Sequence, residues 1–446
     1  HEYFEKLIAP PTIDKHSEKP QSNLSIPNKF KQIQIYLTRD MLSKLSNTQY
    51  MTINLLEAPL LAVILAYIVR FYQSSDGGYV FAKNSNLPAY IFMSVIVALF
   101  IGLSVSAEEI IKDAKIRKRE LFLHLSRSSY LFAKIVLLFG FSAIQTLSFV
   151  IIGNWILGVE QMNFMYWLVL FSTACFANIL GLNISATFDS VVTIYILIPL
   201  LLIPQLLLGG IVVRFNEINP ALASDKKVPL LAEIMASRWA FEAIAVGQFR
   251  HNLYEKNFYE YDQKMAQAEY HKALYIPELE TKLDNIFNFH KIDTLKSKVE
   301  QDLQVLRNEL DLQNHYTMFS FKKLEQLTYN QFEASLYHEA KAHLQKLKKY
   351  YIDEYNENER QKDKVVGELT KTPEGRKEYL ELKAKFHNEA IEKLVTAKET
   401  PERIIVTDEH LVQKVYPIFK NPEPSSFLDF RTHFFAPKKR FAGRLY

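Results

Sequence analysis

The stretch PAYIFMSVIVALFIGLSVS, residues 88–106, carries no charged side chain, and AEEIIKDAKIRKRELFLHLSRSSYLFAK, residues 107–134, follows it directly. The second segment is dense in Lys, Arg and Glu, and it leads into another apolar run at residue 130. A chain that crosses hydrocarbon must satisfy its own backbone hydrogen bonds, so it forms a helix of about 20 mostly apolar residues. The two segments therefore predict a membrane helix, a short charged loop and a second membrane helix.

Similar apolar runs occur elsewhere in the first half of the chain, whereas residues 251–446 are rich in Lys, Glu, Gln, Asn and Tyr. The predicted fold class is all-α: a polytopic membrane helical bundle with a large, mainly helical or coiled-coil extracytoplasmic insertion. The predicted transmembrane region covers residues 51–215. Its five spans are residues 51–72, 88–106, 130–158, 164–188 and 191–215.

The distribution of Lys and Arg orients these spans. The loop at 107–129 is rich in both, whereas the loops at 73–87 and 159–163 together hold only Lys83. Short loops rich in Lys and Arg stay in the cytoplasm. The segment at 28–46 is also basic and has apolar residues at helical spacing, which predicts an amphipathic connecting helix at the inner membrane interface. Residues 1–27 are interpreted as a linker from an upstream domain.

Five spans that start in the cytoplasm place residues 216–446 outside it, and we expect a multi-pass protein of a bacterial inner membrane. Within this part, residues 251–446 are expected to form an extracytoplasmic helical domain. Apolar residues recur every three or four positions from 295 to 310 and from 332 to 351, as in helices with one buried face. Thr372 and Pro373 mark the predicted start of another helix, whose apolar positions continue to Leu394.

Three stretches resemble one known family. NTQYMTINLLEAPLLAVILAYIVRFY, residues 47–72, together with the amphipathic segment resembles that family's connecting helix and first span. EEIIKDAKIRKRELFLHLSRSSYLFAKI, residues 108–135, is similar to its inner loop. GGIVVRFNEINP, residues 209–220, followed by VPLLAEIMASRWAFEAIAVGQF, residues 228–249, is similar to its fifth-span exit and re-entrant external stretch. The family is that of the ABC-2 type permeases of ATP-binding cassette exporters, with the closest likeness to the G subfamily.

The resemblance implies two permease halves, each driven by a nucleotide-binding domain that lies upstream or on a separate chain. ATP and Mg²⁺ would be bound by that domain, because this sequence has no GxxxxGK[ST] loop, and no cofactor is expected in this stretch. The family also returns through a sixth span, so residues 251–446 are expected to lead to a sixth span that is missing here. Residues 216–250 are expected to form the re-entrant or external helices.

Three sets of candidate residues follow. The charged inner loop is the predicted coupling loop, where a soluble partner would dock. The charge of Glu57 is costly to place inside the membrane. Glu57 is therefore either a functional residue or lies near the inner headgroups, paired with a basic residue. A predicted translocation path consists of Glu57, for this reason, and of four residues assigned by analogy with the family. The third family-like stretch supplies a group of external residues. The coupling residues are Glu108, Glu109, Lys112, Arg117, Lys118, Arg119 and Glu120; the path residues are Glu57, Phe92, Phe100, Gln205 and Leu208; the external residues are Arg238, Trp239 and Glu242.

Other classes of function find no support in the sequence. The formal net charge of +4, from 53 basic and 49 acidic residues, predicts no nucleic-acid partner. The single cysteine, Cys175, forms no intrachain disulfide, and no metal-ligand or catalytic motif occurs. The expected partners are the nucleotide-binding domain, a second permease half and membrane lipids. A periplasmic protein is a further candidate partner.

Two functions remain open. In the first, the chain is the permease part of an ATP-driven exporter that moves a lipid-like, amphipathic or peptide cargo outward by alternating access. In the second, it is a membrane scaffold or mechanotransmitter whose external helices act on a periplasmic partner without transport. The external helices could also be a stabilising cap without a partner of their own.

Overall fold

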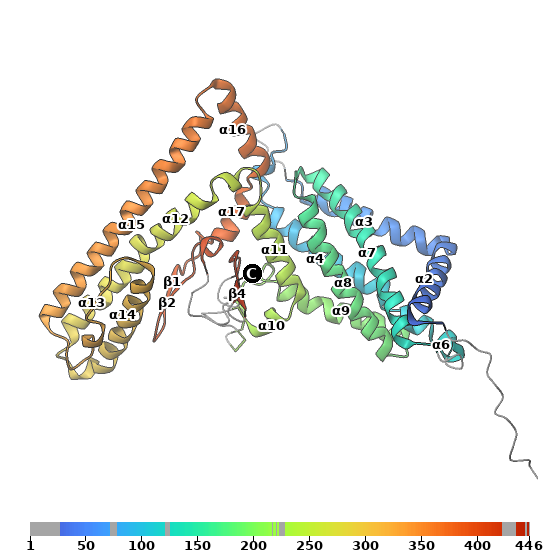
Figure 1. Ribbon diagram of the computed structural model, residues 1–446, viewed down its shortest axis with the longest axis horizontal. Coiled ribbons are helices and arrows are strands. Elements are labelled where there is room, and N and C mark those ends of the chain that lie inside the picture. The colour runs from blue at the N-terminus through green and yellow to red at the C-terminus, as the bar shows by residue number, and fades with distance from the viewer. Residues whose placement is uncertain are drawn as a thin grey trace, which may run out of the picture.

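The computed structural model describes residues 27–71, 78–120, 125–215, 217–219, 221–222, 228–421, 434–441 and 444–445, so the predicted linker at 1–27 lies almost wholly outside the described residues. The chain forms a helical bundle on one side and an elongated helical arm on the other (Figure 1). The prediction of an all-α polytopic membrane protein is confirmed.

The bundle is built from α2 and the apolar helices that follow it. Within the described residues, α3, α4, α7 and α8 are long and apolar enough to cross a membrane. Asn28 caps α2 by accepting a hydrogen bond from the Lys31 amide at 2.8 Å, and Asn47 caps α3 in the same way. The bounds are α2 Lys29–Ser46, α3 Thr48–Val69, α4 Leu87–Ser106, α7 Arg127–Leu157, α8 Asn163–Thr187 and α9 Val191–Leu207, with the 3-10 turn η1 Phe81–Lys83 before α4.

Helix α4 is the most deeply buried of the four spanning helices. It lies against α8, and Gly102 is one point where the two helices approach closely. A Cβ atom added to Gly102 would lie 2.6 Å from the Ala174 carbonyl oxygen and 2.7 Å from the Ala177 Cβ atom. Small residues of this kind let two membrane helices pack backbone to backbone, so α4 and α8 form the centre of the bundle.

The fifth apolar helix is shorter than the sequence predicts. We expected a span over 191–215, but α9 ends at Leu207 after 17 residues, which corresponds to about 25 Å of helix. The chain then turns through Gly209 and Gly210, and Gly210 has a φ of +83°, a left-handed conformation that does not continue a helix. The residues from 208 to 215 therefore form a bent exit at the end of α9.

The arm follows α10 and α11, which fill the region expected to hold external helices. Its helices run away from the bundle and return to it, and α12, α15 and α16 outline a triangle in Figure 1. The bounds are α10 Leu230–Glu233, α11 Ala236–Arg250, α12 Tyr259–Tyr270, α13 Ile276–Phe289, α14 Lys296–Tyr316, α15 Ala334–Leu369, α16 Pro373–Phe386 and α17 Glu389–Thr396; the 3-10 turns are η3 Glu255–Asn257, η5 Asp293–Leu295, η6 Leu324–Gln326 and η7 Pro417–Phe419, and η4 His271–Tyr275 is a π-helical segment between α12 and α13. Two small antiparallel pairs complete it: β1 Ile404–Val406 with β2 Leu411–Gln413, and β3 Arg440–Phe441 with β4 Arg444–Leu445.

The outer part of the arm has its own apolar core, made by α13, α14 and α15. The predicted positions Val299, Leu303, Leu306 and Leu310 of α14 are buried, and they belong to one cluster with the buried face of α15. Burial of these stripes removes apolar surface from water and holds the three helices together. The predicted helical periodicity of this region therefore corresponds to real buried faces.

The predicted helix from Thr372 to Leu394 is wrong in its second half. Thr372 does cap α16 by accepting from the Gly375 amide at 3.0 Å, but the helix stops at Phe386. A new helix, α17, starts after Asn388, whose side chain accepts from the Ile391 amide at 3.0 Å. The break shifts the buried positions, so that Ile391 and Val395 are buried rather than Ala390 and Leu394.

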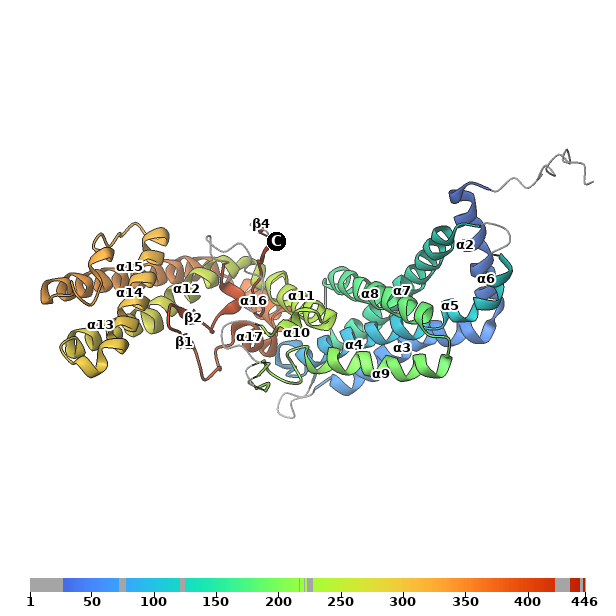
Figure 2. The same cartoon turned by 90° about the horizontal axis from the view of Figure 1, so that it is seen from below.

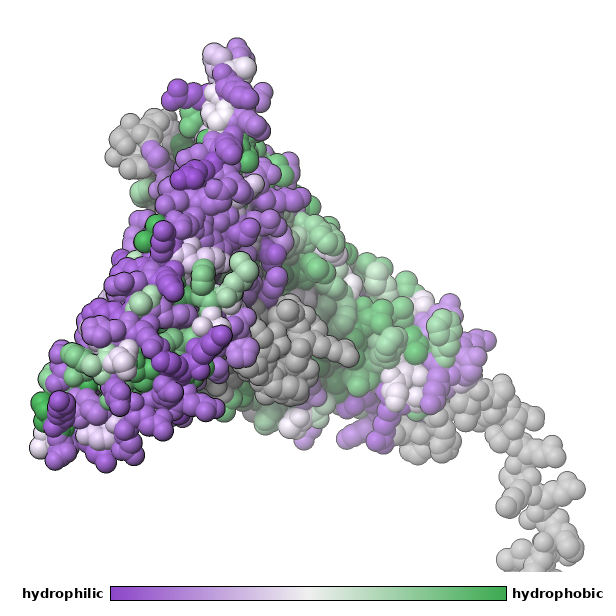
Figure 3. All heavy atoms as spheres, turned by 60° about the vertical axis from the view of Figure 1, so that its left-hand side comes forward, coloured by the Kyte–Doolittle hydropathy of each residue, from purple (hydrophilic) through white to green (hydrophobic). Residues whose placement is uncertain are grey.

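The hydropathy of the surface follows this division. In Figure 3 a largely apolar surface covers the spanning helices, whereas the arm is mainly hydrophilic. Hydrophilic residues return at the far end of the bundle, beyond the apolar surface. The bundle therefore has two polar ends: one carries the arm, and the other carries α2 and the short helices α5 Glu109–Lys112 and α6 Ala114–Glu120.

Candidate functional site

The charged segment after α4 folds into two short helices, α5 Glu109–Lys112 and α6 Ala114–Glu120. They lie beside α2 at the end of the bundle opposite the arm (Figures 1 and 2). The Ser185 hydroxyl at the end of α8 accepts from the amides of Ile110 at 3.0 Å and Ile111 at 3.2 Å. The segment is therefore attached to the spanning helices by its backbone as well as by its charges.

Lys134 is the centre of this end of the bundle. It lies in α7, and its side chain is only 4% exposed. Its ammonium group lies 2.9 Å from Asp40 of α2, 3.1 Å from Glu109 of α5 and 2.8 Å from Asp113 between α5 and α6. A buried lysine is tolerated where carboxylates compensate for its lost hydration, and here three different segments supply them. We call Lys134 and these three carboxylates the lysine hub.

A second layer of ion pairs surrounds the lysine hub. Lys44 of α2 pairs with Glu109, and Arg39 of α2 pairs with Glu120 at the end of α6. Arg39 also donates to Asp40 at 2.9 Å. These pairs join α2 to both short helices, so the three elements and α7 are linked by one network of charges.

Neutral hydrogen bonds extend the network to the start of α7. The Tyr130 hydroxyl donates to Asp113 at 2.9 Å, and the amide of Ser126 donates to the side-chain oxygen of Gln32 at 2.8 Å. The Ser129 hydroxyl donates to the Lys29 carbonyl oxygen at 3.2 Å. Each bond therefore joins α7 or its cap either to α2 or to Asp113, between α5 and α6.

The outer face of α6 is basic and exposed. Ile116 is 45% exposed in the middle of this face, and the Arg117 guanidinium lies 5.9 Å from the centre of the Tyr130 ring. An exposed apolar residue ringed by cations is suited to an acidic protein surface rather than to a membrane interior. The exposed residues of this docking face are Lys112, Lys115, Ile116, Arg117, Lys118 and Arg119.

The predicted coupling residues divide into two groups. Arg117, Lys118 and Arg119 lie on the docking face, whereas Glu109 and Glu120 face inward and join the ion pairs, and Glu108 pairs with Lys112. Sequence reasoning missed Lys134, Asp40 and Asp113. A lysine inside a predicted span is costly and was the available signal for Lys134.

The structure does not gather the predicted path residues. Glu57 is half-buried on α3, whereas Phe92 and Phe100 lie on α4, with Phe92 only 1% exposed and Phe100 40% exposed. The Phe92 ring packs edge-on against Phe241 of α11, with centroids 5.6 Å apart, so it faces the interior of the protomer in this conformation.

The two remaining path residues lie at the end of α9. The side-chain oxygen of Gln205 accepts from the Ser237 amide at 2.9 Å, and the backbone carbonyl oxygen of Gln205 accepts from the Ser237 hydroxyl at 2.6 Å. Gln205 therefore joins α9 to α11, and Leu208 is the C-cap residue directly after α9.

The predicted external residues cluster at the start of α11, where Arg238 and Glu242 are buried and the half-buried Trp239 ring lies 3.8 Å from the Arg238 guanidinium. Arg238 is fully buried, with its guanidinium 3.3 Å from Glu233 and 3.2 Å from Glu242. The Glu242 carboxylate also accepts a hydrogen bond from the Phe435 amide at 2.6 Å and forms an ion pair with the Lys439 ammonium group at 2.8 Å. Residues 435 and 439, near the end of the given sequence, therefore contact α11.

Two residues lie at the break between α16 and α17: Asn388 connects the arm to the bundle, and His387 joins parts of the arm to one another. The Asn388 side chain donates to the carbonyl oxygens of Phe81 at 2.8 Å and Asn84 at 3.0 Å, in the loop between α3 and α4. His387 Nδ1 lies 2.6 Å from Glu255, and its Nε2 lies 3.2 Å from Glu392 of α17. We call residues 387–388 and these partners the arm joint.

The arm joint is expected to weaken in alkaline solution. Burial lowers the pKa of His387, but the hydrogen bonds and charges of Glu255 and Glu392 outweigh burial and raise it from 6.5 to about 9. A pKa that is higher in the folded state gives stability that is complete below pH 6.5 and is lost as the pH rises through 9. Hydrogen exchange of α17 should therefore increase between pH 6.5 and 9, beyond the intrinsic change in exchange rate.

The control for this prediction is His387→Gln, which cannot become charged. Its α17 should show no such pH-dependent change over the same range, after the same correction. The ion pair also lowers the pKa of Glu392 to about 2, so this interaction is lost again only when the pH falls from 4.5 through 2. Equal pH profiles for the two proteins would contradict a charged His387 in the arm joint.

Comparison with known protein families gives one match. Residues 31–249 match the family described as ABC-2 type transporter, and this range runs from α2 to α11. The match includes the lysine hub and the Arg238 cluster, whereas α12 to α17 lie beyond it. No curated protein matches the chain.

Proposed function

Residues 31–249 belong to the ABC-2 type transporter family, and on this premise we propose that the chain is the permease half of an ATP-driven exporter. The chain is a multi-pass membrane protein and a transporter permease component. Such a domain works with an ATP-binding component, which would bind ATP and Mg²⁺ and hydrolyse the nucleotide. The likeness to the G subfamily rests on the three stretches of sequence alone.

The lysine hub is the observation that supports a coupling role. A soluble ATP-binding domain on the docking face of α6 would push on a helix whose neighbours are held to α2 and α7 by buried charges. Buried ion pairs have a limited set of good geometries, so this network favours movement of α2, α5, α6 and the end of α7 as one unit. ATP binding would thereby change the arrangement of the spanning helices.

Transport itself would follow from two arrangements of the spans with different affinity for the cargo. We place the docking face in the cytoplasm of a bacterium and the arm outside the inner membrane, because Lys and Arg concentrate in the 107–129 loop. A second permease half would complete the transporter. The mainly apolar spans favour a lipid-like or amphipathic cargo.

Reconstitution with the ATP-binding component tests this function. In sealed vesicles with the docking face outward, ATP should move a short-chain fluorescent phospholipid from the outer to the inner leaflet, and a non-hydrolysable ATP analogue should not sustain it. Leaflet position is measured by dithionite reduction of the fluorophore. ATP hydrolysis without any movement of the phospholipid, or of a fluorescent amphipathic peptide, would contradict the export function.

The arm joint favours a second candidate function, mechanical transmission to a periplasmic partner. Asn388 ties the arm directly to the loop between α3 and α4, so a movement of these spans would swing the arm. Under this alternative, ATP would change the distance between labels on α13 and α8 in the absence of cargo movement. Asn388→Ala would reduce that change, whereas an exporter with a passive arm would transport normally with the same substitution.

A further inference from the structure

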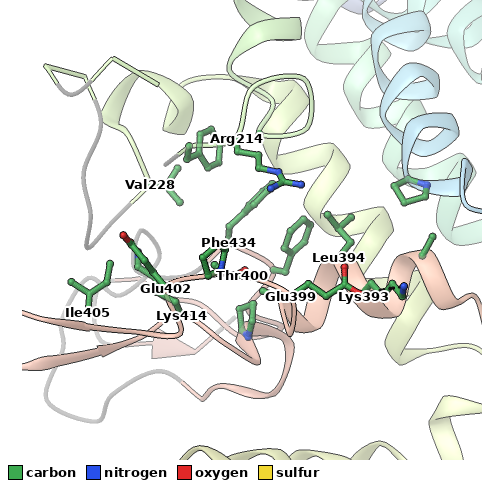
Figure 4. Close-up of a pocket in the computed structure, with 18 of the residues that line it drawn as sticks. Arg214, Val228, Lys393, Leu394, Glu399, Thr400, Glu402, Ile405, Lys414 and Phe434 are labelled. Carbon is green, nitrogen blue, oxygen red and sulfur yellow. Dashed lines mark ion pairs between the residues drawn. The ribbon is translucent and has the colours of Figure 1, made fainter. Parts of the chain in front are cut away.

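A cavity of about 500 Å³ lies where the outer ends of α4 and α9 meet the arm (Figure 4). Pro88 at the start of α4 and Arg214 after α9 line it from the bundle. Leu394 of α17 and Ile405 of β1 line it from the arm. A volume of this size is typical of sites for small molecules, and a molecule held there would touch the bundle and the arm at once.

One wall of the cavity is aromatic. The rings of Phe215 and Phe434 meet with centroids 5.2 Å apart, and Phe435 lies next to Phe434 in the chain. Gly210 makes this contact possible, because a Cβ atom there would lie 2.8 Å from Phe215 and 2.9 Å from Phe434. The bent exit of α9 therefore produces an apolar surface that can take an acyl chain.

The cavity is also lined by charges of both signs. Arg214 is 72% exposed and lies 3.7 Å from Glu217, and Lys393 lies 3.2 Å from Glu399. Glu402 is exposed at the same cavity, and Figure 4 shows it across from Arg214. Exposed ion pairs of this kind are weak, so their members can exchange a protein partner for a ligand group at little cost.

We propose that this cavity binds a zwitterionic amphiphile, such as a lipid with a phosphate and an amine in its headgroup. The acyl part would lie on Phe215 and Phe434, the phosphate near Arg214 or Lys393, and the amine near Glu399 or Glu402. The carboxylates of the cavity would repel an anionic amphiphile. A purely apolar ligand would form no interaction with any of these charged groups. The inference rests on the proposed export function and names the class of cargo at its outer exit.

Fluorescence quenching tests the proposal on the full chain in a maltoside detergent. The only cysteine is replaced by Cys175→Ser, and a bimane is attached at Thr400→Cys, which lines the cavity. The probe is a lysophospholipid with a brominated chain and a phosphoethanolamine headgroup. We expect saturable quenching at position 400 and none at Glu160→Cys, an exposed position in the α7–α8 loop.

Charge reversal identifies the headgroup. Arg214→Glu and Glu402→Lys concern exposed side chains, so both variants should fold, and each should weaken binding of the zwitterionic probe about tenfold. Tighter binding by Glu402→Lys would instead indicate an anionic ligand and overturn the proposal. Equal affinity of all three proteins, or no quenching at position 400, would also overturn it.

Failure of this inference is distinguishable from failure of the export function. If the probe does not bind the cavity but ATP still moves a phospholipid in vesicles, the cargo site lies elsewhere and the exporter remains. If the probe binds and ATP moves nothing, the cavity is a lipid site of a protein that does not export.

Discussion

Replacing Lys134 with methionine is expected to produce the largest loss of stability and of coupling. Methionine matches the length of lysine but has no charge, so Asp40, Glu109 and Asp113 would remain close together without their shared cation. Removal of one partner from a buried ion pair typically costs about 3–5 kcal/mol. We expect a clear fall in the unfolding temperature in detergent and ATP hydrolysis that no longer drives movement of the probe lipid.

The matched control is Lys134→Arg, which keeps a cation at the same position. It should retain most of the coupling, because a guanidinium also pairs with several carboxylates, although its planar shape fits the cluster less well. A second control is Lys134→Met combined with Asp113→Asn, which removes one of the opposed charges and should recover part of the stability. An unfolding temperature of Lys134→Met equal to that of the unmodified protein would show that the lysine hub does not hold α2, α5 and α7 together.

Reversal of the docking face is expected to remove coupling while leaving the fold intact. Arg117, Lys118 and Arg119 are exposed on α6, so changing all three to Glu adds no buried charge. The same change reverses the sign of the surface that an acidic partner would recognise, and opposed like charges at an interface are strongly unfavourable. We expect ATP-driven transport in vesicles to fall at least about tenfold, which corresponds to about 1.4 kcal/mol.

A triple reversal on the arm separates this effect from a change of net charge. Lys371, Arg376 and Lys377 are exposed at the start of α16, far from α6 in Figure 1, and their change to Glu alters the net charge equally. That variant should transport normally. Normal transport by the α6 variant, with unchanged binding of the ATP-binding component, would show that the docking face lies elsewhere.

The features that the sequence predicts well depend on local pattern. A run of about 20 apolar residues has few alternatives to a spanning helix, and Thr372 caps α16 as its position before Pro373 indicates. The end of α9 was predicted too late, although Gly209 and Gly210 were a signal for it. Apolar residues continue beyond the two glycines, and a run of apolar residues does not by itself show where a helix ends. The break at His387 was missed for the same reason, since an apolar stripe crosses it in the sequence.

The features that the sequence does not predict depend on long-range pairing. Lys134 meets Asp40 from 94 residues away, and Asn388 reaches the carbonyl oxygens of residues 81 and 84 from the other half of the chain. A single sequence shows which charges exist but not which helices bring them together. Phe92 is a further example. The sequence places it on a spanning helix but does not show that its ring packs against Phe241 of α11.

The proposed export function requires that the two polar ends of the bundle lie on opposite sides of a membrane. Single cysteines at Lys118 on α6 and Gln345 on α15, each in the Cys175→Ser protein, can be labelled in intact cells with a maleimide that does not cross membranes. We predict that position 345 reacts from the outside, whereas position 118 reacts only after the membrane is opened. Reaction of both positions from the same side of the intact membrane would contradict the arrangement of docking face and arm, and with it the proposed transporter.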